Sequence, residues 1–205
     1  MDEESFDYSI NYTIAGNSLV GKTKLVERFI GGAYKEDYVA TDTVEYYNKN
    51  ITLNNKKYHL NLWEMTANKT FITMNFNFFR KCDCALFVYQ INEKDSFKRI
   101  PDWIVECENQ AEKKVLKVLV GNKCDLENER QVSREEGEEF AEKNKMLFYE
   151  ASAKTGNNVE NVFKGIAEKF SEKIAEDNYN LENDSIEMKK TDENNKKIKK
   201  KKSCC

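Results

Sequence analysis

The chain has 205 residues, which fits one large domain, or one domain with a tail, rather than two full-size domains. Its 33 Lys and Arg against 36 Asp and Glu give a net charge of −3, so no overall basic field points to nucleic acid as a partner. Hydrophobic residues make up 40% of the chain, which is enough for a core, and no apolar stretch is long enough to predict a transmembrane helix. The acidic, polar start from Met1 to Ser5 is unlike a signal peptide, which predicts a cytoplasmic protein.

The first predicted elements are a strand over 8–15 and a helix over 22–30. A hairpin follows, with strands at 51–53 and 58–63 around the turn-forming residues 54–57. Further along, two continuous apolar runs, 85–91 and 115–120, predict central strands that are covered on both faces. Another short strand is predicted at 146–149.

Helices are predicted between these strands. Pro101 suits the first turn of one helix, and Ser133 followed by Glu136 is a capping box for another. From Asn158 onward, apolar residues recur at steps of three and four, which is typical of a helix with one buried face. This alternation of strands and helices predicts an α/β fold in which a mostly parallel sheet lies between helix layers.

The cysteines do not predict a disulfide framework. Four of the six lie in apolar or helical stretches, which favours small buried side chains: Cys82, Cys84, Cys107 and Cys124. With a single histidine and no C-x-x-C pair, a zinc site is not predicted. The remaining two, Cys204 and Cys205, end the chain and need a separate explanation.

The predicted first strand is followed by a G-x-x-x-x-G-K-T sequence and then a helix: Gly16, Asn17, Ser18, Leu19, Val20, Gly21, Lys22 and Thr23. In this context the motif predicts a phosphate-binding loop, because its glycines let successive backbone N–H groups point at a phosphate. Lys22 supplies a cation to the β- and γ-phosphates, and the Thr23 hydroxyl is placed for Mg²⁺. The alternative, a plain glycine turn, does not explain the Lys-Thr pair.

A second motif predicts which base is bound. The segment 122–125 follows a predicted buried strand, at the carboxyl end where α/β proteins bind their ligands. Asp125 can accept two N–H bonds from the guanine edge, Asn122 can bridge the base and the phosphate loop, and the Lys123 stem can cover a ring face. A backbone N–H for the guanine oxygen can come from Ser152, Ala153 and Lys154. For either segment alone, an ordinary polar loop is the alternative.

With these motifs in order from about Tyr8 to Phe170, the chain resembles a small GTPase of the Ras superfamily, and most of all the Rab family. The features specific to Rab proteins are these: Leu62-Trp63, Phe79-Arg80, Ser96-Phe97, Trp103 and the Cys-Cys ending. The resemblance implies a P-loop G domain, with a mostly parallel six-stranded sheet, one antiparallel edge hairpin strand and helices on both faces. It also implies GTP and GDP as ligands and Mg²⁺ as the cofactor.

Several positions differ from the Rab pattern. Thr41 matches the first-switch threonine, which by resemblance binds Mg²⁺ and the γ-phosphate, but the following Asp42-Thr43 stand where Ile-Gly is usual. Leu19 stands where Rab proteins generally have glycine. In the second switch, Glu64 replaces the aspartate that holds a Mg²⁺-bound water, Ala67 replaces the glycine that meets the γ-phosphate, and Asn68 replaces the glutamine that orients the attacking water. The resemblance therefore implies a GTPase in which Lys22 and Asn68 carry the chemistry weakly.

The predicted domain organisation is an N-terminal extension over 1–6, a G domain over 7–175 and a tail over 176–205. The tail is poor in apolar residues, so we expect it to be disordered, and its last 20 residues hold eight lysines against three acidic residues. By resemblance, Cys204 and Cys205 are prenylated and the basic run adds attraction to a membrane. A nuclear-import cluster and a merely solvated tail are the alternatives.

The resemblance implies a membrane-attached switch in vesicle traffic, which is cytoplasmic and cycles onto endomembranes. Its expected partners are a prenylation escort, GDI, an exchange factor, an activating protein and effectors, with no nucleic acid among them. The alternative within this family is a GTP- or GDP-binding scaffold that does not hydrolyse. An ATP-dependent P-loop kinase is disfavoured by Asp125 and by the absence of lid-like arginine clusters.

Overall fold

The computed structural model describes residues 5–34, 43–66, 77–112 and 114–176. By its contacts the chain divides into two units, Met1–Ala167 and Glu168–Cys205. The elements of the first unit are β1 (Tyr8–Ala15), α1 (Lys22–Ile30), β2 (Glu45–Leu53), β3 (Lys56–Glu64), α3 (Asn77–Arg80), β4 (Cys84–Gln90), α4 (Lys94–Lys98), α5 (Ile100–Gln110), β5 (Leu116–Asn122), the 3₁₀ turn η1 (Glu127–Glu129), α6 (Arg134–Lys143) and β6 (Leu147–Glu150). Residues 159–176 are helical and continue into the second unit.

The six strands form one sheet in the order β2-β3-β1-β4-β5-β6. All neighbouring pairs are parallel except β2 and β3, which are antiparallel and place β2 at one edge. The predicted fold class is therefore confirmed. Because β1, β3, β4, β5 and β6 run in the same direction, the loops that follow them lie at one edge of the sheet, where α/β proteins bind ligands.

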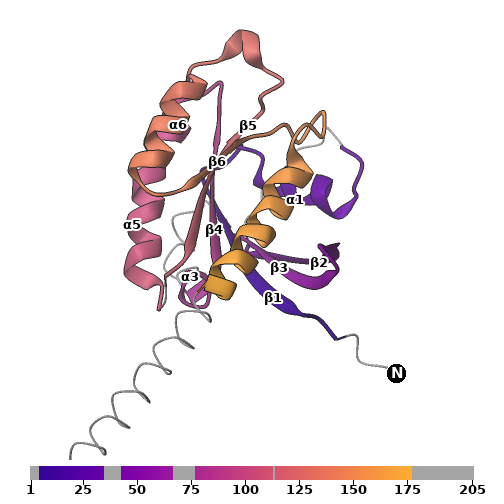
Figure 1. Ribbon diagram of the computed structural model, residues 1–205. Coiled ribbons are helices and arrows are strands. Elements are labelled where there is room, and N and C mark those ends of the chain that lie inside the picture. Colours follow the sequence, from indigo (N-terminus) through magenta and orange to yellow (C-terminus); the bar gives the residue numbers. More distant parts are fainter. Residues whose placement is uncertain (1–4, 35–42, 67–76, 113, 177–205) are drawn as a thin grey trace, which may run out of the picture. The chain divides into compact units, whose positions relative to one another are not determined.

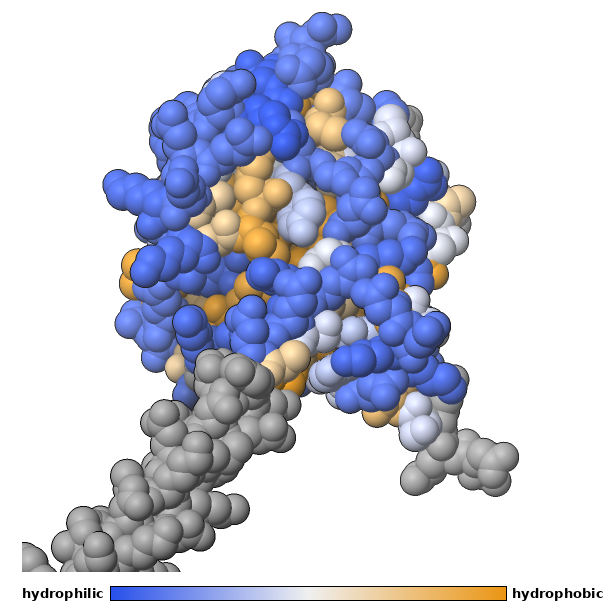
Figure 2. Space-filling view, in the orientation of Figure 1, coloured by the Kyte–Doolittle hydropathy of each residue, from blue (hydrophilic) through white to orange (hydrophobic). Residues whose placement is uncertain are grey.

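Helices cover both faces of this sheet (Figure 1). One face carries α1 and the helical residues 159–167, which are joined by stacking of the Phe29 and Phe163 rings, with 4.2 Å between centroids. The Tyr12 hydroxyl of β1 also donates to the Phe163 carbonyl at 3.2 Å. The other face packs against α5 and α6 around a buried apolar cluster that includes Phe97 and Trp103. In Figure 2 most side chains on the visible face are hydrophilic, with apolar ones gathered near its centre.

The helix signals in the sequence correspond to observed helix starts. The Ser133 hydroxyl accepts a hydrogen bond from the Glu136 backbone N–H at 3.1 Å and caps α6. Pro101 lies in the first turn of α5. Cys82, Cys84 and Cys107 are buried and form no disulfide, as predicted, whereas Cys124, which also forms none, is only half-buried. None of the helices in the described segments has the length and apolar character that a membrane span requires.

The hairpin differs from its prediction in length. Only Asn54 and Asn55 form the turn, both with positive φ (50° and 61°), and the two strands pair from Leu53 and Lys56 outward to Glu45 and Glu64. Two asparagines with positive φ form a two-residue turn that matches the twist of the strands. The first strand was predicted too short because most of β2 is half-buried or exposed and its sequence is largely polar.

Candidate nucleotide-binding site

The phosphate loop runs from Gly16 to Gly21, between β1 and α1. Gly21 has φ +88°, and a Cβ at this position would lie 2.5 Å from the Asn122 amide nitrogen. At Gly16 a Cβ would lie only 2.2 Å from the Val88 carbonyl oxygen of β4, which is backbone and cannot move aside cheaply. Both glycines are therefore required by the close packing of the loop against its neighbours.

Lys22 is the first residue of α1, and its side chain folds back into the loop. Its ammonium group donates to the Gly16 and Asn17 carbonyl oxygens, at 3.1 Å each. Burial lowers the pKa of Lys22, while the nearby Glu64 opposes this effect. The positive end of the α1 dipole and a buried cation thus lie together, which favours a bound anion such as a phosphate.

Leu19 occupies a strained position in this loop. Its φ is 69°, in the left-handed region, and its side chain is 58% exposed. A leucine in this conformation costs roughly 1–2 kcal/mol, and the side chain gains little burial in return.

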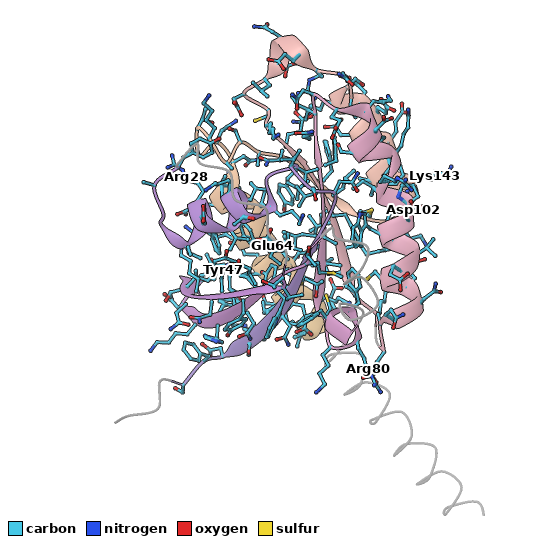
Figure 3. The ribbon with its side chains drawn as sticks, turned by 180° about the vertical axis from the view of Figure 1, so that it is seen from behind. Arg28, Tyr47, Glu64, Arg80, Asp102 and Lys143 are labelled. Carbon is cyan, nitrogen blue, oxygen red and sulfur yellow. The ribbon has the colours of Figure 1, made fainter. Side chains whose placement is uncertain are left out.

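The side chains of Thr23 and Glu64 meet beside the loop. The Thr23 hydroxyl donates to Glu64 Oε1 at 2.7 Å. Glu64 is 1% exposed, and its second oxygen, Oε2, has no hydrogen-bond partner among the described residues. Burial raises the pKa of Glu64, whereas the Lys22 charge and the Thr23 hydrogen bond lower it. Figure 3 shows Glu64 near α1, with Tyr47 on the neighbouring strand.

This arrangement fits a hard divalent cation. A hydroxyl oxygen and a buried carboxylate with one unsatisfied oxygen are the ligand types that Mg²⁺ prefers. Within the described residues no cluster of three or more His, Cys, Asp or Glu side chains is arranged to hold a metal.

Asn122 ties the phosphate loop to the two loops that follow β5 and β6. It is 1% exposed; its amide donates to the Val20 carbonyl at 2.7 Å, and its Oδ1 accepts from the Ala153 backbone N–H at 3.3 Å. The Ser152 hydroxyl donates to Asp125 Oδ1 at 2.6 Å. Three segments far apart in sequence are thereby held at one edge of the sheet.

The two lysines of these loops differ in surroundings. Lys123 has φ 64°, and its ammonium group hydrogen-bonds the Gln90 side-chain oxygen. Burial lowers the pKa of Lys123, and the charges of Glu93 and Asp125 oppose the shift. Lys154 is exposed in the loop that follows β6, which is the third loop of the site after the phosphate loop and the loop that follows β5.

Five predicted site residues lie outside the described residues: Thr41, Ala67, Asn68, Cys204 and Cys205. Their assigned roles stay predictions.

Several contacts around the site were not predicted from the sequence. Arg28 of α1 donates to the Thr155 carbonyl of the third loop at 3.3 Å. Arg130 binds both carboxylate oxygens of Glu150, at 2.6 and 3.0 Å, at the end of β6. Glu45 lies directly opposite Glu64 in the β2–β3 pair. Of these contacts, only the pairing of Glu45 with Glu64 could have been predicted from the sequence. A turn placed at Asn54-Asn55 fixes which residues of the two strands lie opposite each other.

A glycine-rich loop between a central strand and a helix that begins with Lys-Thr, in a mostly parallel sheet, defines a P-loop nucleotide-binding protein of the α/β class. Comparison with known proteins narrows this class. A family model described as the Ras family matches residues 11–172. The Ras-related protein Rab-2B of Dictyostelium discoideum is 35% identical over 170 residues, which are 83% of this chain and 84% of the relative.

Two further relatives agree. The GTP-binding protein YPT1 of Saccharomyces cerevisiae is 34% identical over 194 residues, covering 95% of this chain and 92% of the relative. The human Ras-related protein Rab-30 is 36% identical over 167 residues, 82% of each chain. The chain belongs to the Rab family of Ras-superfamily small GTPases.

Proposed function

We propose that this protein is a membrane-attached guanine-nucleotide switch in vesicle traffic, with slow intrinsic hydrolysis of GTP. The observation that carries the proposal is that hydrogen bonds join three loops at one edge of the sheet. Asn122 bonds to Val20 and to Ala153, and Ser152 bonds to Asp125. Family membership supports GTP and GDP as ligands, and one relative is named as a GTP-binding protein.

Each loop has a separate task in this proposal. The backbone N–H groups of 16–23 and the Lys22 ammonium bind the phosphates at the start of α1. Asp125, oriented by Ser152, accepts the guanine N–H groups. The backbone N–H of Lys154 or a neighbour in that loop serves the guanine oxygen, while the Lys123 stem covers the ring.

The cation site is assigned to Thr23 and Glu64, with Thr41 by resemblance. Mg²⁺, when bound, offsets the charge of the β- and γ-phosphates. Glu64 accepts a hydrogen bond from the Thr23 hydroxyl, which leaves the Thr23 oxygen lone pairs available to a cation. The buried, unsatisfied Glu64 Oε2 gives this assignment its physical support.

Slow hydrolysis follows from the changed second switch. Asn68 is one methylene shorter than glutamine, so its amide falls about 1 Å short of the water it orients, a misplacement that costs on the order of 100-fold in rate. Ala67 adds a methyl group where the backbone approaches phosphate, and Glu64 lengthens the carboxylate arm at Mg²⁺. The triple variant Glu64→Asp, Ala67→Gly and Asn68→Gln should release phosphate faster from bound GTP in a single turnover; an unchanged rate refutes this account.

The same three residues support a second candidate, a guanine-nucleotide scaffold that does not hydrolyse. Single-turnover phosphate release from the parent protein separates the two, since a scaffold gives none within hours. The ratio of GTP to GDP in protein purified from cells adds an independent measure, because a scaffold that binds GTP retains it.

Guanine specificity rests on Asp125. Asp125→Ala should weaken GDP binding by about 30- to 5000-fold, the equivalent of roughly 2–5 kcal/mol for two lost hydrogen bonds and the stranded donors. Asn144→Ala, which alters the residue that follows the end of α6, away from the loops, is the control. Equal GDP binding by Asp125→Ala, or equal competition by ATP, excludes the guanine assignment.

Membrane attachment is assigned to the segment 176–205, beyond a G domain over 7–175. Prenyl groups on Cys204 and Cys205 together with Lys199–Lys202 give two signals, which stable attachment generally needs. The cytoplasmic protein would then cycle onto endomembranes through an escort protein, GDI, an exchange factor, an activating protein and effectors. Membrane fractionation of a double Cys→Ser variant tests this, because unchanged pelleting excludes lipid on these residues.

A further inference from the structure

Two carboxylates face each other across the β2–β3 pair at the cation site. Glu45 is the register partner of Glu64. Directly opposite residues of an antiparallel pair lie on the same face of the sheet, with Cβ atoms about 4.5–5.5 Å apart. The charges of Glu45 and of Glu27 on α1 both act on Glu64.

Within the described residues, one hydrogen bond to the Glu45 carboxylate is observed. The contact to its Oε2 is the Tyr47 hydroxyl, a neutral donor at 2.8 Å. Glu27, in contrast, pairs with the Lys24 ammonium at 3.0 Å. Like charges directly opposite each other destabilise a strand pair, and one member of this pair is buried. The nearby Lys22 charge offsets part of this repulsion at Glu64, and a cation between the strands and α1 would offset the rest.

A second observation points to the same place. Glu64 is 1% exposed, and its Oε2 lacks a hydrogen-bond partner within the described part of the chain. Its Oε1 accepts a hydrogen bond from the Thr23 hydroxyl at 2.7 Å. A buried carboxylate with one unsatisfied oxygen thus lies beside a hydroxyl, and both are oxygen groups of the kind that would hold Mg²⁺.

We propose that Glu45 is a further residue of the cation site. Glu45 would bind the cation through a water molecule, beside Thr23 and Glu64. The inference rests on the proposed function, because it assumes that a nucleotide and a divalent cation bind here. The attraction between Glu45 and the cation then outweighs the repulsion between Glu45 and Glu64, but only when the cation is bound. Glu45 therefore strengthens cation binding and lowers the stability of the cation-free protein.

The test is the release of a fluorescent GDP analogue at buffered free Mg²⁺ concentrations. Outer carboxylates of metal sites contribute about 10- to 100-fold to metal affinity, so Glu45→Gln should raise the free Mg²⁺ at half-maximal retention about tenfold. Glu45→Asp, which keeps the charge, should lie closer to the parent. Glu139→Gln on α6, an exposed carboxylate away from the loops, is the matched control and should not change the midpoint.

Thermal unfolding separates a cation role from a structural one. In EDTA, Glu45→Gln should melt at or above the parent temperature because the repulsion with Glu64 is removed, whereas in Mg²⁺ and GDP it should melt below the parent. A side chain with a merely structural role shifts both temperatures in the same direction. A decrease in both conditions, or a Mg²⁺ midpoint within twofold of the parent, overturns the proposal.

The experiment also distinguishes failure of the two proposals. If the parent does not bind the GDP analogue at all, the proposed function is wrong and the role of Glu45 falls with it. If the parent binds and Glu64→Gln raises the Mg²⁺ midpoint while Glu45→Gln does not, the cation site stands without Glu45, and only the present inference is wrong.

Discussion

Replacing Asn122 by alanine should both destabilise the protein and loosen its hold on GDP. The side chain is 1% exposed, and its two shorter hydrogen bonds run to the Val20 carbonyl at 2.7 Å and from the Ala153 N–H at 3.3 Å, beside a longer one to the Gly21 carbonyl at 3.5 Å. Both partners in the shorter bonds belong to buried residues, at 0% and 4% exposure, so truncation leaves a buried acceptor and a buried donor without their bonds.

The magnitude follows from the cost of an unsatisfied buried group, about 1–3 kcal/mol each. Because the 3.3 Å bond is long, we expect a total of roughly 2–4 kcal/mol, or a melting temperature lower by about 5–12 °C. The phosphate loop and the third loop are then no longer joined, so GDP release should accelerate by at least about tenfold, which corresponds to about 1.4 kcal/mol.

A second substitution at this position sharpens the test. Asn122→Asp keeps an acceptor for the Ala153 N–H but points an oxygen at the Val20 carbonyl oxygen and buries a charge, so it should be at least as destabilising as Asn122→Ala. Urea unfolding and release of a fluorescent GDP analogue measure the two effects. Asn144→Ala, which loses a 2.7 Å bond to the Phe140 carbonyl on α6, should lose stability without faster release. If Asn122→Ala unfolds within about 0.5 kcal/mol of the parent, our reading of this contact is wrong.

Three further predictions concern stability and reactivity. Leu19→Asn should stabilise the protein by about 1 kcal/mol in thermal unfolding, because asparagine tolerates the left-handed conformation at φ 69° and the leucine is 58% exposed; a loss of stability contradicts this. Arg130→Met should cost about 2 kcal/mol in urea unfolding, since it leaves Glu150, whose side chain is 8% exposed, with only the longer ion pair to Arg134 at 3.7 Å; a cost below 1 kcal/mol refutes the assigned ion pair. Burial raises the pKa of Cys82 to about 11 and that of Cys107 to about 12, so at pH 8 both should resist alkylation until the protein unfolds, as peptide mapping can check; rapid labelling of either in the native protein refutes their burial.

The parts of the fold that were predicted correctly depend on local signals. The bounds of β1 and α1 could be read from the sequence because a strand pattern ends at a glycine loop and a helical pattern begins at Lys22. Pro101 and Ser133 likewise mark helix starts by properties of the residue itself. These signals concern residues within a few positions of one another, so no knowledge of the tertiary structure was needed.

The contacts that complete the site are not local. The Asn122 amide and the Val20 carbonyl are 102 positions apart, and Arg130 and Glu150 are 20 apart. Such pairs depend on strand order and on how each loop leaves the sheet, which no short sequence pattern specifies. An arginine and a glutamate are also common on surfaces, so residue type alone did not distinguish this buried pair from an exposed one.

The β2–β3 hairpin is an intermediate case, in which one local detail determines several distant contacts. With the turn at Asn54-Asn55, the register places Glu45 against Glu64 on the inner face and Tyr46 against Trp63 on the outer face. The outer pair is in ring contact, with 4.5 Å between centroids. A shift of one residue would exchange the two faces, moving the carboxylates outward and the aromatic rings inward. A two-residue turn far from the site therefore determines both the charge at the cation site and the aromatic surface on the opposite side of the same strands.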